Sequence, residues 1–492
     1  MLIKVVNPNL AAISDEQLNA TLQSFLSTLC PQTDDWTASK KVLLLPPDFT
    51  RYHSQAGKIS SMLYTHSVAG NSPLNNDSDG FKITDIMPAL GTHQPMNEKQ
   101  YLEMFGQEIN DANLHRIHDW RNDVITIGHA PAEMVNEATR GLVQKPWPAQ
   151  LNKIVVNGNH DLIFSIGQVV PHEVMGMANY NKNLFVGVGG VEAINLSHFI
   201  GAVYGMEKMM GKADNPLRAI LNYSSKQFLE GSLPLYYIQT VMGTNLQTNK
   251  LEMKGLFIGD NIECYNEACA LSLKVNFTMV EKPLTKVIVQ LDADEFHSTW
   301  LGNKAIYRTR MALATGGHLI ILAPSVCKFG EDGECDRLIR KYGYVNTPKI
   351  MKYMSENEEL QSNLSVVAHL IHGSSEERFN VTYCTPLISC GEILNVGYNY
   401  DDIDIVKEKY QVDQLQDGMN IINGEEVFYV SNPALGLWAH QSRLEYDDDK
   451  KFNGKRVSEV AMDVEQVTNT GETGSSGGVG GWASSSNKKS KH

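Results

Sequence analysis

Residues 161–199 read DLIFSIGQVVPHEVMGMANYNKNLFVGVGGVEAINLSHF, and this stretch decides the fold of the chain. It opens with residues 161–170, which are apolar throughout instead of alternating, as in a strand buried on both faces of a parallel sheet. A glycine cluster and a presumed helix follow, and this succession is typical of α/β proteins. The polar and glycine landmarks of the stretch are His172, Lys182, Gly187, Gly189, Gly190 and His198.

Similar apolar runs recur along the chain and alternate with amphipathic stretches. Because 492 residues exceed what one hydrophobic core normally serves, we predict two α/β domains with mostly parallel sheets and a cofactor and substrate cleft between them. The expected strands lie at 41–48, 82–90, 123–129, 152–158, 161–170, 286–293 and 318–326, and the expected helices at 97–109, 132–143 and 304–314.

Changes in composition along the chain suggest the domain boundaries. A new series of strands and helices begins after residues 270–285, so we expect an N-terminal domain at 1–275 and a C-terminal domain at 276–465. Residues 466–492 are rich in glycine and serine with a basic end, which predicts a disordered tail that carries no chemistry.

The overall composition limits which binding partners and which cellular compartment we expect. The net charge of −14 argues against nucleic acid or an anionic membrane, because binding to either depends largely on Lys and Arg. Neither a signal-peptide core nor a run of 18 apolar residues is present. The seven cysteines are spread thinly without a CxxC, which is typical of reduced thiols. We therefore expect a cytoplasmic protein.

Polar side chains follow three of the predicted strands. PPDFTR (46–51) ends the first run, LGTHQP (90–95) the second and VVPH (169–172) the run at 161–170. In open parallel sheets, ligands bind beyond the carboxyl ends of the strands, so these loops are candidates for one site. For any single loop, ordinary surface polarity explains the composition equally well.

The order of these motifs resembles the lactate racemase family. The chain has Asp-x-Thr-Arg, then Gly-Thr-His, then Pro-His with a lysine ten residues later and a histidine twenty-six residues later. The similarity is strong through roughly the first 200 residues and diffuse beyond them. The resemblance implies an isomerase, a racemase or epimerase that inverts C2 of a 2-hydroxy acid by reversible hydride transfer. The hydride acceptor would be a lysine-tethered nickel-pincer nucleotide (a pyridinium-3-thioamide-5-thiocarboxylic acid mononucleotide that holds nickel).

The resemblance also implies a role for each matching residue. Lys182 would be the attachment point of the cofactor, His198 the protein ligand to nickel, and His93 and His172 the two acid/base groups. It makes the N-terminal domain the catalytic one and implies that cofactor-synthesis enzymes mature the protein. The positions that would line the nucleotide phosphate and substrate region are Asp48, Thr50, Arg51, Gly187, Gly189 and Gly190.

Chemistry supports this set of residue types. If the C2 hydrogen leaves as hydride, a base must take the hydroxyl proton, and each enantiomer needs such a base. Imidazole suits this task near neutral pH, and soft donors with imidazole in a plane suit nickel. Arg51 offers a planar fork for a carboxylate or phosphate.

The chain departs from the family pattern at three places around the cofactor. Residues 177–181 (MANYN) replace the usual Ser-Gly-Gly before the lysine, Gln94 replaces an arginine, and Ser197 replaces an asparagine. We therefore expect a divergent member of the family.

In the second half, the best match to a substrate-binding pair is Tyr307-Arg308-Thr309-Arg310. Arg308 and Arg310 are two positions apart on a predicted helix and cannot face one direction. We select Arg308 as the substrate contact, with a solvated helix face as the alternative. An arginine here would suit a sugar acid or a dicarboxylate as well as lactate.

Three other functions are alternatives to this hypothesis. The string GNHD (158–161) resembles a metallophosphoesterase block, although the companion blocks of that class are missing. A relative without cofactor that only binds a small acid is a second alternative. A dehydrogenase using free NAD is a third, for which GVGG (187–190) is the nearest approach to a dinucleotide motif.

Overall fold

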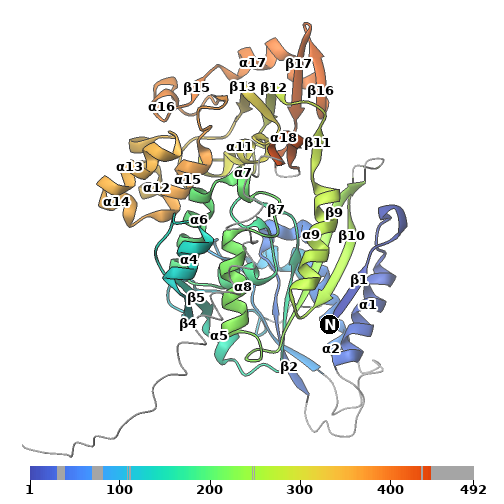
Figure 1. The fold of residues 1–492 in the computed structure, drawn as a ribbon. Helices are drawn as coiled ribbons and strands as arrows, with labels where there is room; N and C mark the ends of the chain where they lie inside the picture. The colour runs from blue at the N-terminus through green and yellow to red at the C-terminus, as the bar shows by residue number, and fades with distance from the viewer. Residues whose placement is uncertain are drawn as a thin grey trace, which may run out of the picture.

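The computed structural model describes residues 1–29, 39–68, 81–107, 109, 112–245, 248, 250–433 and 436–444. Within these ranges the chain forms two six-stranded sheets, each with helices packed against it (Figure 1). The predicted tail at 466–492 and the end of the predicted second domain lie outside the described residues.

The first sheet is built from the N-terminal half of the chain. Four of its strands, β9, β6, β2 and β3, are parallel neighbours, and two antiparallel strands complete one edge. The strand order is β1 (Leu2–Val5), β10 (Lys250–Gly259), β9 (Leu235–Asn245), β6 (Leu162–Gln168), β2 (Lys40–Leu45) and β3 (Phe81–Ile86).

Both faces of this sheet are covered, which explains why its strands are apolar without alternation. Val42 and Leu44 of β2 belong to a core cluster with α1 and α2, whereas Leu43 and Leu45 belong to a second cluster with α6 and α8. The helices of this half are α1 (Asp15–Leu29), α2 (Ala56–Val68), α3 (Glu98–Phe105), α4 (Ala132–Ala138), α5 (Lys153–Asn157), α6 (Val191–Tyr204), α7 (Met206–Met209), α8 (Pro216–Phe228) and α9 (Ile262–Asn276), with the short turns η1 (Pro8–Leu10), η2 (Phe49–Ser54) and η3 (Asn183–Gly187).

The second sheet draws its strands from residues 284–430 and has only one antiparallel pair, β16 with β17. Its order is β15 (Asn399–Tyr400), β14 (Asn380–Cys384), β13 (Leu313–Leu322), β12 (Leu284–Gln290), β17 (Glu425–Val430) and β16 (Gly418–Ile422). The helices of this half are α10 (Thr299–Gly302), α11 (Lys304–Thr309), α12 (Gly333–Tyr342), α13 (Thr347–Glu356), α14 (Glu358–Gln361), α15 (Leu364–Gly373), α16 (Cys390–Asn395), α17 (Ile403–Tyr410) and α18 (Gln441–Leu444), with the turn η4 (Val412–Gln414).

The α/β class with mostly parallel sheets is therefore confirmed. β11 (Thr278–Val280), which lies in sequence between the two series of strands, pairs in parallel with β18 (Trp438–His440), which follows the second series. The exact domain boundary at 275/276 and the cleft between the domains stay predictions.

Two of the predicted strands differ from the structure. Within the run at 152–158, Lys153–Asn157 form the helix α5, because the Asn152 side chain caps it by accepting from the Ile154 N–H and Gly158 follows its last turn. The run at 123–129 is a strand, β4 (Val124–Ala130), but it pairs antiparallel with β5 (Trp147–Asn152) outside the main sheet. Apolar β-branched residues alone did not distinguish these cases.

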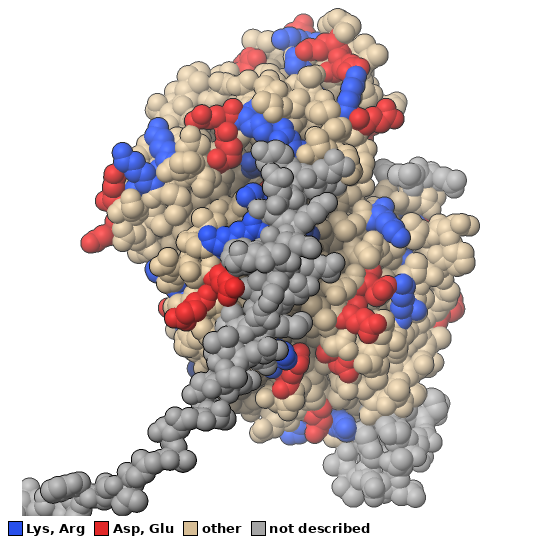
Figure 2. Space-filling model, in the orientation of Figure 1, with Lys and Arg blue, Asp and Glu red and all other residues tan. Residues whose placement is uncertain are grey.

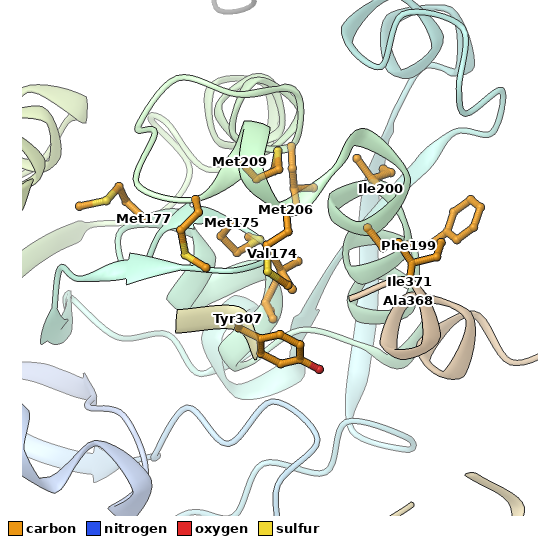
Figure 3. Close-up of a cluster of buried hydrophobic side chains, with 14 of the residues drawn as sticks. Val174, Met175, Met177, Phe199, Ile200, Met206, Met209, Tyr307, Ala368 and Ile371 are labelled. Atoms are coloured by element: carbon orange, nitrogen blue, oxygen red, sulfur yellow. The ribbon is translucent and has the colours of Figure 1, made fainter. Parts of the chain in front are cut away.

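The two halves share one continuous hydrophobic cluster. α6 of the first half packs against α15 of the second. Figure 3 shows Phe199 of α6 beside Ala368 and Ile371 of α15, with Val174, Met175 and Met206 between α6 and Tyr307 of α11. Because burial of these side chains depends on both halves, the packing between them contributes to the stability of each.

Charges are mixed on the surface. Lys and Arg side chains are interspersed with Asp and Glu over the described part of the face in Figure 2. No helix in the described ranges combines the length and the apolar character that a membrane crossing needs.

Candidate active site

The candidate site lies where three neighbouring parallel strands end. β6, β2 and β3 are adjacent, so the loops that follow them meet at one edge of the sheet. η2, which carries Thr50 and Arg51, follows β2, the loop with His93 follows β3, and β7 (Pro171–His172) follows β6. The three polar loops predicted from the sequence are thus brought together.

The buried carboxylate of Asp48 pairs with the exposed imidazole of His93. The His93 Nδ1 lies 2.5 Å from an Asp48 carboxylate oxygen, and the Thr50 hydroxyl donates to the other oxygen. Burial would raise the pKa of Asp48, but the bonds from His93 and Thr50 and the charge of Arg51 hold it below its ordinary value. Asp48 therefore orients His93, whose ring is 59% exposed.

The segment that carries Lys182 is tied to the strand ends. The Asn183 side chain donates to the Leu45 carbonyl at 2.9 Å and to the Ser165 hydroxyl at 3.0 Å. The Gly91 N–H, in the loop of His93, donates to the Gly187 carbonyl at 2.8 Å. These bonds hold the loops after β2, β3 and β6 to the backbone beside Lys182.

The altered loop before Lys182 has the backbone conformation that glycine favours. Asn179 and Tyr180 have φ angles of 66° and 59°, in the left-handed region. The buried Arg218 donates to the Asn179 carbonyl, to the Met177 carbonyl at 2.7 Å and to the Asn181 side chain. Side-chain bonding from α8 thus maintains a path that glycines would adopt more readily.

Lys182 itself is half-buried among charges. Burial and the positive charge of Arg51 lower the pKa of Lys182 to about 8, against the opposing effect of Glu173 and Asp48. Among the described residues no ion pair involves its amine. An amine with a lowered pKa is neutral, and so nucleophilic, in a larger fraction of molecules.

His198 lies on α6 and presents one ring nitrogen to the site. Its Nδ1 donates to the Ile194 carbonyl at 2.7 Å, one turn earlier, so the Nε2 keeps its lone pair. Ser197, beside it, accepts from the Trp147 indole at 3.0 Å, which gives the serine a packing role of its own.

His172 is bonded differently. The backbone N–H groups of Val174 and Met175 both donate to its Nδ1, at 3.1 and 3.3 Å. Burial lowers its pKa well below the ordinary value, and the charges of Lys182 and Arg51 act in the same direction.

Electrostatic interactions join the four predicted chemical groups. His172 interacts with Lys182 and with His198, and His198 interacts with Lys182 and with His93. The imidazoles and the amine that the sequence singled out thus share one neighbourhood.

Close packing accounts for the three glycines. A Cβ on Gly189 would lie 1.9 Å from the Phe185 carbonyl oxygen, and one on Gly190 would lie 2.4 Å from the Gln150 side chain. A Cβ on Gly187 would lie 2.8 Å from Ala89. Their part in phosphate binding stays a prediction.

The two arginines of the second half bond to different groups. Arg308 is buried and donates to the Pro171 carbonyl, while its Nε has no partner among the described residues. Arg310 instead pairs with Glu207 and donates to the carbonyls of His372 and Ser374. A pocket formed by both halves is lined by Arg51, His53, Gln168, Val170, Pro171, Leu251, Asn276, Arg308, Gly436 and Leu437.

Sequence reasoning missed two groups near the site. Glu173 is a carboxylate whose pKa burial would raise, but His172, Arg308 and Arg51 lower it. Its position next to His172 was a signal that could have identified it. His372 on α15 is buried with its Nε2 unpartnered among the described residues, and no local motif marks it.

The GNHD block has structural partners. His160 bonds through its Nε2 to Asp85 at 2.8 Å, and Asp161 accepts from the Lys41 N–H. In the described part of the chain no three His, Cys, Asp or Glu side chains gather as a metal site.

Comparisons with known proteins agree with this picture. Residues 2–211 match the family model described as the lactate racemase N-terminal domain. The fold is similar to the crystal structure of a protein from Thermotoga maritima, with a TM-score of 0.72 and 23% identity, over 89% of this chain and 100% of that one. It is also similar to the lactate racemase apoprotein from Thermoanaerobacterium thermosaccharolyticum, with a TM-score of 0.61 and 15% identity, over 85% and 92% of the two chains. No curated protein sequence matches the chain.

Proposed function

We propose that the protein is an isomerase that inverts C2 of a 2-hydroxy acid, because residues 2–211 match the family model described as the lactate racemase N-terminal domain. The observation that carries the proposal is the electrostatic neighbourhood shared by His93, His172, Lys182 and His198. A protein that only binds a small acid has no need of an amine and three imidazoles in one place.

We further propose that Lys182 and His198 hold a nickel-pincer nucleotide that other enzymes synthesise. The lowered pKa of Lys182 supports attachment through its amine, and the lone pair that the Nδ1 bond to Ile194 leaves on the Nε2 of His198 supports ligation. The left-handed backbone of residues 179 and 180, which glycines would adopt readily, supports a similar path of the replaced loop before Lys182. When bound, such a group supplies a hydride acceptor next to a soft metal centre.

The protein's own residues bind the substrate and move the hydroxyl proton. Arg51 and Arg308 line one pocket and suit the substrate carboxylate, with the unpartnered Arg308 Nε available to donate. Asp48 keeps the proton of His93 on Nδ1, which leaves the His93 Nε2 able to take the hydroxyl proton. His172 supplies a second imidazole beside Glu173.

The substrate in this proposal is a 2-hydroxy acid. Arg51 and Arg308 supply two cations, and Glu173, whose pKa they lower, supplies a carboxylate that offsets part of their charge. Lys304 also interacts with these groups, but it is paired with Glu295 at 3.3 Å. A dicarboxylate or sugar acid therefore suits the site as well as lactate does.

Nickel content and isomerisation test the proposal together. The full chain, produced with nickel and the cofactor-synthesis enzymes, is expected to contain nickel and to abolish the optical rotation of a 2-hydroxy acid found by screening. The C2 hydrogen should be retained in deuterated water, because a hydrogen moved as hydride does not exchange.

Variants make the test specific to the site. His198→Ala is expected to lose nickel, whereas His129→Ala, at an exposed position on β4, should keep it. Lys182→Ala should lose the covalently attached mass. Full nickel and full activity in His198→Ala would contradict the ligand assignment, and incorporation of deuterium at C2 would contradict hydride transfer.

A further inference from the structure

The hairpin of β4 and β5 is bonded to the segment that leads to His198. Its two strands pair with each other outside the main sheet. The bonds reach residues 188, 193 and 197 in turn: the Asn152 N–H donates to the Val188 carbonyl at 2.8 Å, the Ala193 N–H donates to the Gln150 side chain at 3.3 Å, and the Trp147 indole donates to the Ser197 hydroxyl at 3.0 Å. β5 therefore follows the chain from η3 into the second turn of α6.

His118, which precedes β4 in the chain, bonds to the same segment from a buried position. Its Nε2 lies 2.9 Å from the Gly189 carbonyl oxygen, and its Nδ1 lies 3.0 Å from the side-chain nitrogen of Asn152. The residue is only 2% exposed. Burial lowers the pKa of the ring against the opposing effect of the Gly189 carbonyl, Asp119 and Asp123, so the neutral imidazole is favoured.

Backbone groups at both ends determine the direction of these bonds. The Oδ1 of Asn152 accepts from the Ile154 N–H, so the NH₂ group of Asn152 faces His118 and donates to its Nδ1. A neutral imidazole with a lone pair on Nδ1 carries its proton on Nε2. His118 therefore donates to the Gly189 carbonyl.

The start of α6 depends on such bonds because it has no side-chain cap of its own. Its N-cap is Gly190, which has no side chain that could accept from the first turn. The donor from His118 reaches the residue before this cap, and the bonds from β5 follow within the next two turns. His198 lies about two turns after the start of the helix, so a change in the direction of the first turn moves its ring.

We propose that His118 is a positioning residue for His198. By donating to the Gly189 carbonyl, it fixes the start of α6 against the β4–β5 hairpin, and this fixes the place of the His198 ring. A metal ligand must be held within about 0.5 Å of its working position, so groups that act through the ligand's own helix affect how long the metal stays bound. The role toward nickel rests on the proposed function, whereas the role toward α6 does not.

His160 provides a matched control for a role in stability alone. Its side chain is also only 2% exposed and also bonds through Nε2, but its partner is Asp85 of β3. Asp85 keeps Arg116 as a second partner at 2.7 Å, so His160→Leu does not leave the carboxylate unpaired. If His118 were only a buried, bonded histidine, His118→Leu and His160→Leu would have the same consequences.

Hydrogen exchange of the full chain without cofactor, followed by mass spectrometry, tests the role toward α6. His118→Leu should speed exchange of the amides at 191–199 about tenfold beyond any change in β6 and β9, because one buried hydrogen bond is lost locally. The amide of His118→Gln can still donate and should restore most of the protection. In His160→Leu these amides should change no more than those of β6 and β9. Equal acceleration throughout the chain in His118→Leu would overturn the proposal.

The rate at which nickel leaves the matured protein in excess EDTA tests the role toward the metal. His118→Leu should release nickel roughly tenfold faster, while His118→Gln and His160→Leu should stay close to the wild type. Ser197→Ala, which removes only the acceptor of the Trp147 bond, is a milder variant and should release nickel about threefold faster. Unchanged release in both His118→Leu and Ser197→Ala would overturn the role toward nickel. If the matured wild type holds no nickel, the proposed function fails, whereas the exchange experiment still decides whether His118 fixes α6.

Discussion

The loop at 177–182 and the helix α11 both bring a positive charge to the site, but they are held in different ways. The loop is bonded along its length by Arg218 from its own half of the chain. α11 belongs to the second half, and its Arg308 makes one long bond, to the Pro171 carbonyl at 3.4 Å. Two residues later, Arg310 joins the halves through Glu207.

This difference matches the two roles that we propose, attachment of the cofactor for the loop at 177–182 and recognition of the substrate for α11. A residue that carries a cofactor must stay in one place, so its loop benefits from a fully bonded backbone. An arginine that receives an anion benefits from donors left unpaired, and the Nε of Arg308 is one. Arg310 keeps α11 in position while Arg308 remains available.

The largest expected loss of stability comes from removing the hydrogen bonds that Arg218 donates to the loop at 177–182. Arg218→Met removes a buried guanidinium and with it the donor to the Asn179 carbonyl and the Asn181 side chain, and it leaves the Met177 carbonyl with only the Tyr265 hydroxyl among the described donors. Because buried groups left unsatisfied are costly, we expect a loss of about 4 kcal/mol of stability. Chemical denaturation followed by circular dichroism measures it. Arg337→Met, exposed on α12, is the control and should stay within about 0.5 kcal/mol of the wild type.

The second-largest expected loss of stability comes from removing the ion pairs between the two halves of the chain. Glu207 accepts from Arg310 at 3.1 Å and from Arg378 at 2.8 Å, and Glu207→Gln leaves these two arginines without a countercharge. We expect a loss of roughly 3 kcal/mol at neutral pH, measured by the same denaturation. If Glu207→Gln loses less stability than the Arg337→Met control, these ion pairs do not stabilise the contact between the two halves.

The same ion pairs predict a pH dependence of stability. Burial would raise the pKa of Glu207, but Arg310 and Arg378 hold it below the ordinary value. A depressed carboxyl pKa stabilises the fold above the ordinary glutamate value of about 4.3 and loses this contribution as the pH falls through the folded-state pKa. The difference between the wild type and Glu207→Gln should therefore shrink in acid. A difference that grows in acid would contradict this assignment.

The smallest expected effect is a change in substrate binding without a change in stability. Arg308→Lys keeps the charge in the pocket but removes the planar fork and the unpartnered Nε. We expect KM for the 2-hydroxy acid to rise about tenfold, near the value of one charged hydrogen bond, with little change in nickel content or stability. Steady-state kinetics and nickel analysis measure both. Loss of nickel in this variant would place Arg308 at the cofactor instead of the substrate.

Much of the site could be predicted because each of its motifs is local. Asp48 to Arg51, His93 and His172 each follow an apolar run, and parallel neighbours bring the ends of such runs to one edge. The strand expected at 152–158 failed for a local reason as well, since the cap on Asn152 outweighed the apolar residues behind it.

The sequence by itself determined the α/β class, the strands of the first sheet that carry the site, and the identity of the amine and imidazoles. Hydrophobic periodicity and the spacing of chemical groups lie within short stretches of chain, so they are visible without coordinates. Only the tertiary structure decided how these groups are used. The carboxylate that orients His93 is 45 residues away, and Arg218 bonds a loop 37 to 41 residues earlier. The hydrogen bonds that the His172 Nδ1 accepts depend on the direction of two backbone N–H groups, which no pattern of residue types records.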